Sequence, residues 1–152
     1  MLNPDIDIRI EAPAWREAVD DCEAFVRWTL AAAVAVEGEA GSLAVLLSDD
    51  ENVRVLNKRW RGQDKATNVL SFPAAEGFGL GDIVLAYETV AREAEAHNKA
   101  FAAHASHLLV HGYLHLIGYD HVADDEAEEM ETHEREILAD LGIRDPYEAI
   151  AG

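Results

Sequence analysis

Short apolar runs bounded by turn residues recur along the 152-residue chain, and segments with helical periodicity separate them. The runs are short and rich in Ile, Val and Leu, which predicts β-strands at residues 5–11, 43–47, 68–72 and 82–86. Elsewhere apolar residues recur at three- and four-residue spacing, which predicts helices at residues 15–36, 51–60, 87–99, 101–117 and 124–141. This alternation predicts a single α+β domain over residues 1–152, in which about five helices cover one mixed four-stranded sheet.

The charge of the chain restricts the partners that it can bind. Its formal net charge of -18 repels nucleic acid at long range. The charge is uneven, however, because residues 54–65 hold five basic residues and one acidic residue, a local charge of +4. This basic segment is either a solvated helix face that balances an acidic protein or a surface that binds a phosphate group.

Cysteine content and hydropathy indicate a cytoplasmic protein with no membrane partner. Cys22 is the single cysteine, so no internal disulfide can form, and we expect it to be a small packing residue. The longest apolar segment, residues 30–36, is far shorter than the roughly 20 residues of a membrane span. No basic stretch followed by an apolar run marks an export signal.

The segment HGYLHLIGYDH contains the strongest chemical signal in the sequence. His111 and His115 are four residues apart on a predicted helix, which places both imidazoles on one helix face within reach of one metal ion. Gly118 interrupts the helix, so the chain can turn back and bring His121 to the same ion. Three neutral imidazoles that leave one position open are typical of a catalytic zinc site.

The other histidines and the nearby carboxylates are not expected to bind the metal ion. His107 lies two turns before His115, about 12 Å along the helix axis, so one ion cannot bind both. We expect His104 and His107 to support the ligands or to pack in the core, and Asp120 to orient a ligand or shape the turn. His97 and His133 are expected on solvated surfaces, as is the acidic helix after residue 124.

A catalytic site of this kind also needs a general base or a cation. In the HExxH pattern of zinc peptidases a glutamate base follows the first histidine, but here Gly112 occupies that position. Zinc alone can lower the pKa of bound water to about 7. Arg61, in a predicted glycine-containing loop of the basic segment, is the candidate cation for a negatively charged phosphate.

These segments resemble a known family. HGYLHLIGYDH is similar to the H-x3-H-x5-H motif of the YbeY endoribonucleases, bacterial factors of rRNA maturation. Further blocks of the chain resemble family motifs in the same order: LNKRWRGQDKATNVLSFP at 56–73, GDIVLA at 81–86 and AEEMETHEREILADLG at 127–142. The resemblance covers roughly residues 43 to 142.

The resemblance implies a zinc-dependent endoribonuclease that cleaves single-stranded RNA. It implies one Zn²⁺ per chain bound by His111, His115 and His121, although another divalent transition metal such as nickel satisfies the same ligands. Arg61 and His111 are then the catalytic residues. The implied roles are 3′-end maturation of small-subunit rRNA and ribosome quality control. The implied partners are rRNA and the ribosome, with a ribosomal protein or an assembly GTPase for docking, and no DNA.

Two other functions remain open from the residues alone. One is a zinc peptidase that shares the helix-borne histidine pair, against which Gly112 argues. The other is a non-catalytic ribosome assembly factor in which zinc only links the last helix to the loop. Casein cleavage without RNA cleavage would favour the peptidase, whereas the assembly factor predicts that zinc loss unfolds the protein and that Arg61→Ala keeps its cellular function.

Overall fold

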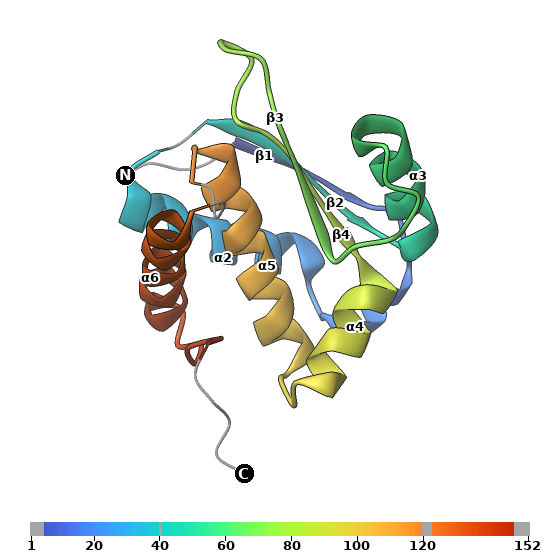
Figure 1. Cartoon of the computed structure of the whole chain (residues 1–152). Helices are drawn as coiled ribbons and strands as arrows, with labels where there is room; N and C mark the ends of the chain where they lie inside the picture. Colours follow the sequence, from blue (N-terminus) through green and yellow to red (C-terminus); the bar gives the residue numbers. More distant parts are fainter. Residues whose placement is uncertain (1–4, 40, 120–122, 148–152) are drawn as a thin grey trace.

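The computed structural model describes residues 5–39, 41–119 and 123–147 (Figure 1). Four strands form one sheet: β1 (Asp5–Ile10), β2 (Ser42–Ser48), β3 (Val69–Pro73) and β4 (Gly81–Ala86). The described residues contain six helices, namely α1 (Ala14–Ala18), α2 (Cys22–Glu37), α3 (Asp50–Arg61), α4 (Tyr87–Ala96), α5 (Phe101–Leu116) and α6 (Asp124–Asp140). The predicted α+β class and the mixed four-stranded sheet are therefore confirmed.

The strand order, which the sequence pattern does not give, is β1-β2-β4-β3. β1 and β4 pair in parallel with β2, so that Val45 lies between Ile8 and Ile83. β3 pairs antiparallel with β4 alone and forms one edge of the sheet. The outer edge of β3 pairs with no other strand of the described residues, and the site described below lies beside this strand.

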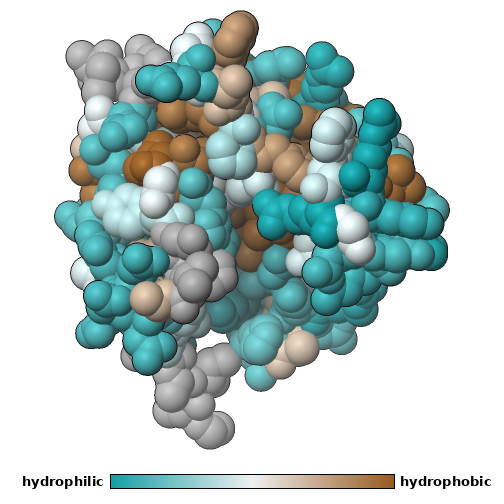
Figure 2. Space-filling view, turned by 45° about the horizontal axis from the view of Figure 1, so that its top comes forward, coloured by the Kyte–Doolittle hydropathy of each residue, from teal (hydrophilic) through white to brown (hydrophobic). Residues whose placement is uncertain are grey.

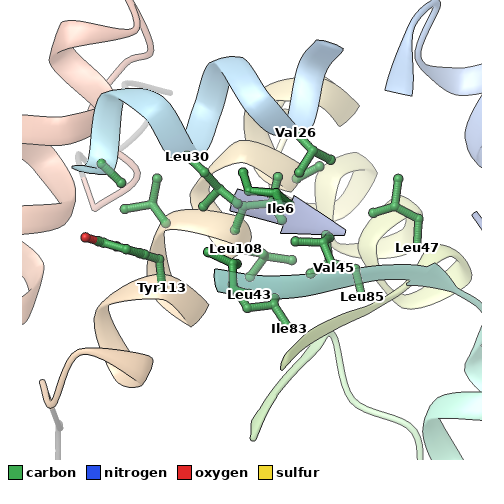
Figure 3. Close-up of a cluster of buried hydrophobic side chains, with 14 of the residues drawn as sticks. Ile6, Val26, Leu30, Leu43, Val45, Leu47, Ile83, Leu85, Leu108 and Tyr113 are labelled. Atoms are coloured by element: carbon green, nitrogen blue, oxygen red, sulfur yellow. The ribbon is translucent and has the colours of Figure 1, made fainter. Parts of the chain in front are cut away.

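The larger core lies between one face of the sheet and helices α2, α4, α5 and α6. Alternate residues of the inner strands point to this face, including Leu43, Val45 and Leu47 of β2. Figure 3 shows side chains of α2 and of α5, such as Leu30 and Leu108, pointing toward these strands. α5 packs between the sheet and the other helices, which makes it the central helix of the fold.

The opposite face of the sheet is covered by α3. Val53 of α3 packs on Leu70, Val84 and Ala86, which are the residues of β3 and β4 that point away from the larger core. Asp49 caps the N-terminus of α3, because its side chain accepts a hydrogen bond of 2.8 Å from the backbone nitrogen of Asn52. Arg54, Lys58 and Arg59 of α3 are exposed on the surface of the molecule.

The helix predicted at residues 15–36 is wrong in one respect, because it is two helices. Val19 is extended, and the Asp21 side chain accepts a hydrogen bond of 3.0 Å from the backbone nitrogen of Ala24 and so begins α2. The apolar periodicity continues across this break because Trp15 of α1 and Cys22 of α2 are buried in the same core. Cys22 is a packing residue, as predicted, and its thiol lies 3.3 Å from the carbonyl oxygen of Trp15.

Within these residue ranges, every helix is too short or too polar to cross a lipid bilayer.

Candidate active site

Helix α5 holds the two histidines of the predicted metal site. Most of its residues are buried, and its partly exposed stripe contains His107, His111 and His115 at four-residue spacing. The His111 side chain is 24% exposed, which leaves its ring accessible from the surface although its helix lies in the core. The helix thus places both imidazoles at the edge of the core, where they can contact a ligand.

Gly112 allows α5 to approach the sheet closely. The Ser71 hydroxyl of β3 donates a hydrogen bond of 3.3 Å to the carbonyl oxygen of Gly112. A Cβ atom at residue 112 would lie 3.0 Å from both the Ser71 Oγ and the Ile83 Cγ2 atoms. Any larger side chain at this position would therefore meet β3 and β4 rather than the histidine pair. This contact brings His111 beside the edge strand β3.

The two ring nitrogens of the histidine pair fit one metal ion. His111 Nε2 and His115 Nε2 lie 3.1 Å apart, and their ring planes are 78° from parallel. Two nitrogen ligands at about 2.0–2.1 Å from a tetrahedral zinc ion lie roughly 3.3–3.4 Å apart. The observed separation is close to this value, so one proton or one metal ion can bridge the two nitrogens.

A buried carboxylate fixes the orientation of His111. Glu134 of α6 is fully buried, and its Oε1 atom lies 2.6 Å from His111 Nδ1. Because a carboxylate accepts hydrogen bonds, the proton of neutral His111 lies on Nδ1 and the Nε2 lone pair faces His115. This is the arrangement in which a histidine ligand of zinc is commonly held by a carboxylate.

Three side chains donate hydrogen bonds to Glu134. His107 Nε2 lies 3.1 Å from its Oε2 atom, and the Tyr147 hydroxyl also donates to Oε2. Burial alone would raise the pKa of Glu134, but the hydrogen bonds from His107, His111 and Tyr147 outweigh burial and lower the pKa to about 2. Glu134 is therefore ionised at neutral pH and stabilises the Nδ1 proton of His111.

Arg61 faces the histidine pair across a pocket of about 600 Å³. Its guanidinium donates a hydrogen bond of 2.8 Å to the carbonyl oxygen of Ser71 and lies over the Phe72 ring, 5.6 Å from the ring centroid. Arg61 is the last residue of α3 rather than a loop residue, because the helix continues until Gly62 adopts a left-handed conformation (φ 70°). The helix end and the edge strand together hold this cation in place.

The pocket walls come from three parts of the fold. α3 contributes Arg61, and α5 contributes the histidine pair. β3 and the residue before it contribute Asn68 and Ser71, while Tyr119 follows α5. The pocket therefore combines two imidazoles, one cation and several hydrogen-bonding groups.

Two of the predicted site residues, His121 and Asp120, lie outside the described residues. In the three described ranges, no three His, Cys, Asp or Glu side chains are arranged to hold a metal ion. The described part of the site thus brings together two of the three predicted ligands, His111 and His115, and metal binding by all three stays a prediction.

The structure also shows where the other predicted histidines lie. His107 shares the Glu134 carboxylate with His111, the contact expected of a residue that supports the site, and its role toward a metal ligand stays a prediction. His104 is buried, and its Nε2 atom lies 2.9 Å from Glu93 Oε1. His97 is exposed, as predicted.

The predicted solvated position of His133 is wrong. Its Nδ1 atom lies 2.7 Å from a carboxylate oxygen of Glu37, and its ring contacts the hydroxyl of Tyr119. Burial and the nearby Glu37 carboxylate raise the pKa of Tyr119 to about 12, so its hydroxyl stays protonated at the pocket wall. The sequence pattern alone did not indicate this role for Tyr119.

The acidic helix is likewise not entirely solvated. Its first turns are exposed, but Glu134 is buried. One signal could have revealed this carboxylate. Glu134 follows Met130 by four residues and precedes Ile137 and Leu138 by three and four, which places it on the buried face of α6.

Fold and pocket together define a class: an α+β protein in which a helix-borne histidine pair faces an arginine across a polar pocket. The model of the family described as Endoribonuclease YbeY matches residues 7–142. The chain belongs to the YbeY endoribonuclease family, as the motif resemblance indicates. Membership in this family places the chain among the nucleases.

Relatives of similar length support this assignment. The chain is 51% identical to the "Endoribonuclease YbeY" of a Bradyrhizobium strain, a match that covers 95% of this chain and 92% of the relative. It is 48% identical to that of Sinorhizobium medicae, covering 94% of each. The solution structure of TM1509 from Thermotoga maritima matches with a TM-score of 0.57 and 23% identity, covering 95% of this chain and 99% of that one, and shows the same fold.

Proposed function

We propose that the chain is a zinc-dependent endoribonuclease that cleaves single-stranded RNA during 3′-end maturation of small-subunit rRNA and in ribosome quality control. The single observation that carries the proposal is the pair of Nε2 atoms 3.1 Å apart, facing Arg61 across one pocket. Family membership supports the nuclease class.

The donor set fits a zinc ion. His111 and His115 would hold it, with His121 as the predicted third ligand, and Glu134 keeps the His111 lone pair on Nε2. When bound, zinc supplies a Lewis acid for the phosphodiester or for an attacking water. Another divalent transition metal satisfies the same imidazoles, so metal content is part of the test.

Arg61 provides the positive charge for the scissile phosphate. A guanidinium can donate two parallel hydrogen bonds to phosphate oxygens, and its charge stabilises the negative charge that develops in the transition state. The hydrogen bond to Ser71 and the contact with Phe72 fix the position of the Arg61 side chain before substrate binds. The protonated Tyr119 hydroxyl at the pocket wall can donate a further hydrogen bond to the substrate.

The position of these groups favours single-stranded RNA. Arg61 and the histidine pair line the inside of a pocket between α3, β3 and α5. A phosphate of an unpaired strand can enter such a pocket with its bases splayed apart, whereas a duplex holds its phosphates on a stiff outer surface.

The outer face of α3 is the proposed RNA-binding surface. Lys58, Arg59 and Trp60 are exposed there, one turn or less before Arg61, and Trp60 is 63% exposed. Basic side chains contact phosphates, and an exposed indole can stack on an unpaired base. The face of the molecule in Figure 2 is mostly hydrophilic, with apolar residues in separate patches.

The net charge of -18 makes tight binding to free RNA unfavourable. We therefore propose that a ribosomal protein or an assembly GTPase helps the chain to dock on the ribosome in the cytoplasm. DNA and membranes are not proposed partners.

Reversal of one charge on α3 is expected to weaken RNA binding. Arg59→Glu should raise the KM for a single-stranded rRNA fragment, and the slope of log affinity against log salt should become shallower by about 1 because one phosphate contact is lost. Filter binding at several salt concentrations measures the slope. Arg9→Glu on β1 is the matched control, and an equal effect of both variants would show that only net charge matters.

Metal removal tests the proposal as a whole. Chelated protein should lose cleavage of a single-stranded rRNA fragment and regain it with one equivalent of Zn²⁺ per chain, while the same sequence in a duplex stays intact. Metal analysis and gel assays measure both. Full cleavage by metal-free protein would contradict zinc dependence.

A peptidase activity is tested with the same samples. Casein cleavage without RNA cleavage would support the zinc-peptidase alternative. Gly112 argues against it, because a side chain at that position would contact Ile83 and Ser71 instead of a substrate.

A further inference from the structure

The segment 143–147, which follows α6, is held in place by several contacts although it contains no regular helix. The Arg135 guanidinium pairs with the Asp145 carboxylate at 3.1 Å. The Asp145 side chain accepts a hydrogen bond of 2.8 Å from the backbone nitrogen of Tyr147. The Lys99 ammonium donates a hydrogen bond of 3.1 Å to the carbonyl oxygen of Pro146. This segment is therefore fixed from both α6 and the α4–α5 connection.

These contacts direct the Tyr147 side chain toward the buried Glu134. The Tyr147 hydroxyl donates to Glu134 Oε2, and its ring packs edge-on against His107 with centroids 5.5 Å apart. Arg135 lies over the outer face of the same ring, 5.3 Å from its centroid. Tyr147 thus closes the surface over the carboxylate that holds His111.

We propose that Tyr147 is a positioning residue of the metal site, which acts on His111 through Glu134. This inference rests on the proposed metal site and adds to it a residue that contacts Glu134 and His107 and is not among the residues that line the pocket of Arg61. Its physical basis is the distribution of donors around one carboxylate.

The two oxygens of Glu134 have different partners. Oε2 accepts from both His107 and Tyr147, whereas Oε1 faces His111 at 2.6 Å. Two donors on Oε2 fix the carboxylate plane, so that Oε1 stays in line with the His111 Nδ1 proton. Without the tyrosine hydroxyl, Oε2 accepts from His107 alone, so the plane of the carboxylate is fixed less tightly. The Nδ1-protonated tautomer of His111 would then be less favoured, and its Nε2 lone pair less available to a metal.

The first test measures zinc affinity by competition with a chromogenic chelator. Tyr147→Phe keeps the ring but removes the hydroxyl, and we expect it to weaken zinc binding about tenfold, the lower end of the range for groups that orient metal ligands. Tyr87→Phe is the matched control, because its ring packs against Trp15 and Phe101 in the core. Its zinc affinity should equal that of the wild-type protein.

A double-mutant cycle separates positioning from a general structural effect. In a Glu134→Gln background, Tyr147→Phe should cause little further loss of zinc affinity, because the two residues act through one hydrogen bond. A wild-type affinity in Tyr147→Phe, or the same loss in both backgrounds, would overturn the inference.

A second measurement needs neither metal nor the Glu134 variant. ¹⁵N NMR of the metal-free protein should show His111 protonated on Nδ1 in the wild type and a mixture of tautomers in Tyr147→Phe. An unchanged tautomer would overturn the inference. Wild-type protein that binds no zinc would instead refute the proposed metal site, and the tautomer would still report whether Tyr147 positions His111.

Discussion

His115→Ala is expected to lose stoichiometric zinc and all measurable RNA cleavage. Structural zinc sites have apparent binding free energies of about 10–16 kcal/mol, so the loss of one of three protein ligands should cost roughly 3–5 kcal/mol, or about 10²–10⁴-fold in affinity. His107, the next histidine on the same stripe of α5, is bonded through its Nε2 atom to Glu134, so we do not expect it to replace the lost nitrogen. Metal analysis after gel filtration, together with an RNA cleavage assay, measures both losses.

His97→Ala is the control for that variant. His97 is an exposed histidine that ends α4, so its replacement should leave zinc content and cleavage unchanged. Retention of one zinc per chain by His115→Ala would show that the metal, if functional, binds elsewhere.

Arg61→Ala is expected to separate metal binding from catalysis. Loss of one preorganised charge at the transition state typically costs about 10²–10³ in kcat. Zinc content should stay at one per chain, because Arg61 contacts Ser71 and Phe72 and not the described imidazoles. Single-turnover cleavage of a single-stranded rRNA fragment measures the rate.

Two further variants control for charge and for geometry. Arg9→Ala removes a positive charge from β1, at the other edge of the sheet, and should cleave at the wild-type rate. Arg61→Lys keeps the charge but loses the planar fork of donors, so an intermediate rate is expected. Wild-type cleavage and cellular function in Arg61→Ala would remove Arg61 from the mechanism, and would favour an assembly factor with structural zinc.

Local patterns were sufficient to predict most elements of the fold. Strands such as β2 and helices such as α5 differ in length and in apolar period, so their positions follow from nearby residues. The strand order does not, since it depends on which strands pair across the chain. The break between α1 and α2 was also missed, because Asp21 begins a helix without interrupting the apolar period.

The candidate site was predictable where its residues share one element. His111 and His115 are one helical turn apart, so their spacing alone indicated a shared ion. Glu134 and Tyr147 reach His111 only because α6 and the segment after it pack on α5, and sequence distance gives no measure of that contact. Tyr119 depends in the same way on Glu37 and His133, which come from two other helices.

Since α5 is both the central core helix and the carrier of the imidazoles, its packing and its chemistry cannot be adjusted independently. The contact of Gly112 with Ser71 and Ile83 sets how far the helix is rotated about its own axis. Side-chain atoms lie roughly 5–6 Å from a helix axis, so a rotation of about 10° displaces them by about 1 Å. A misplacement of that size can slow a reaction about 100-fold. The spacing between this helix and the sheet therefore determines where the imidazoles of His111 and His115 lie in the pocket that Arg61 and Ser71 also line.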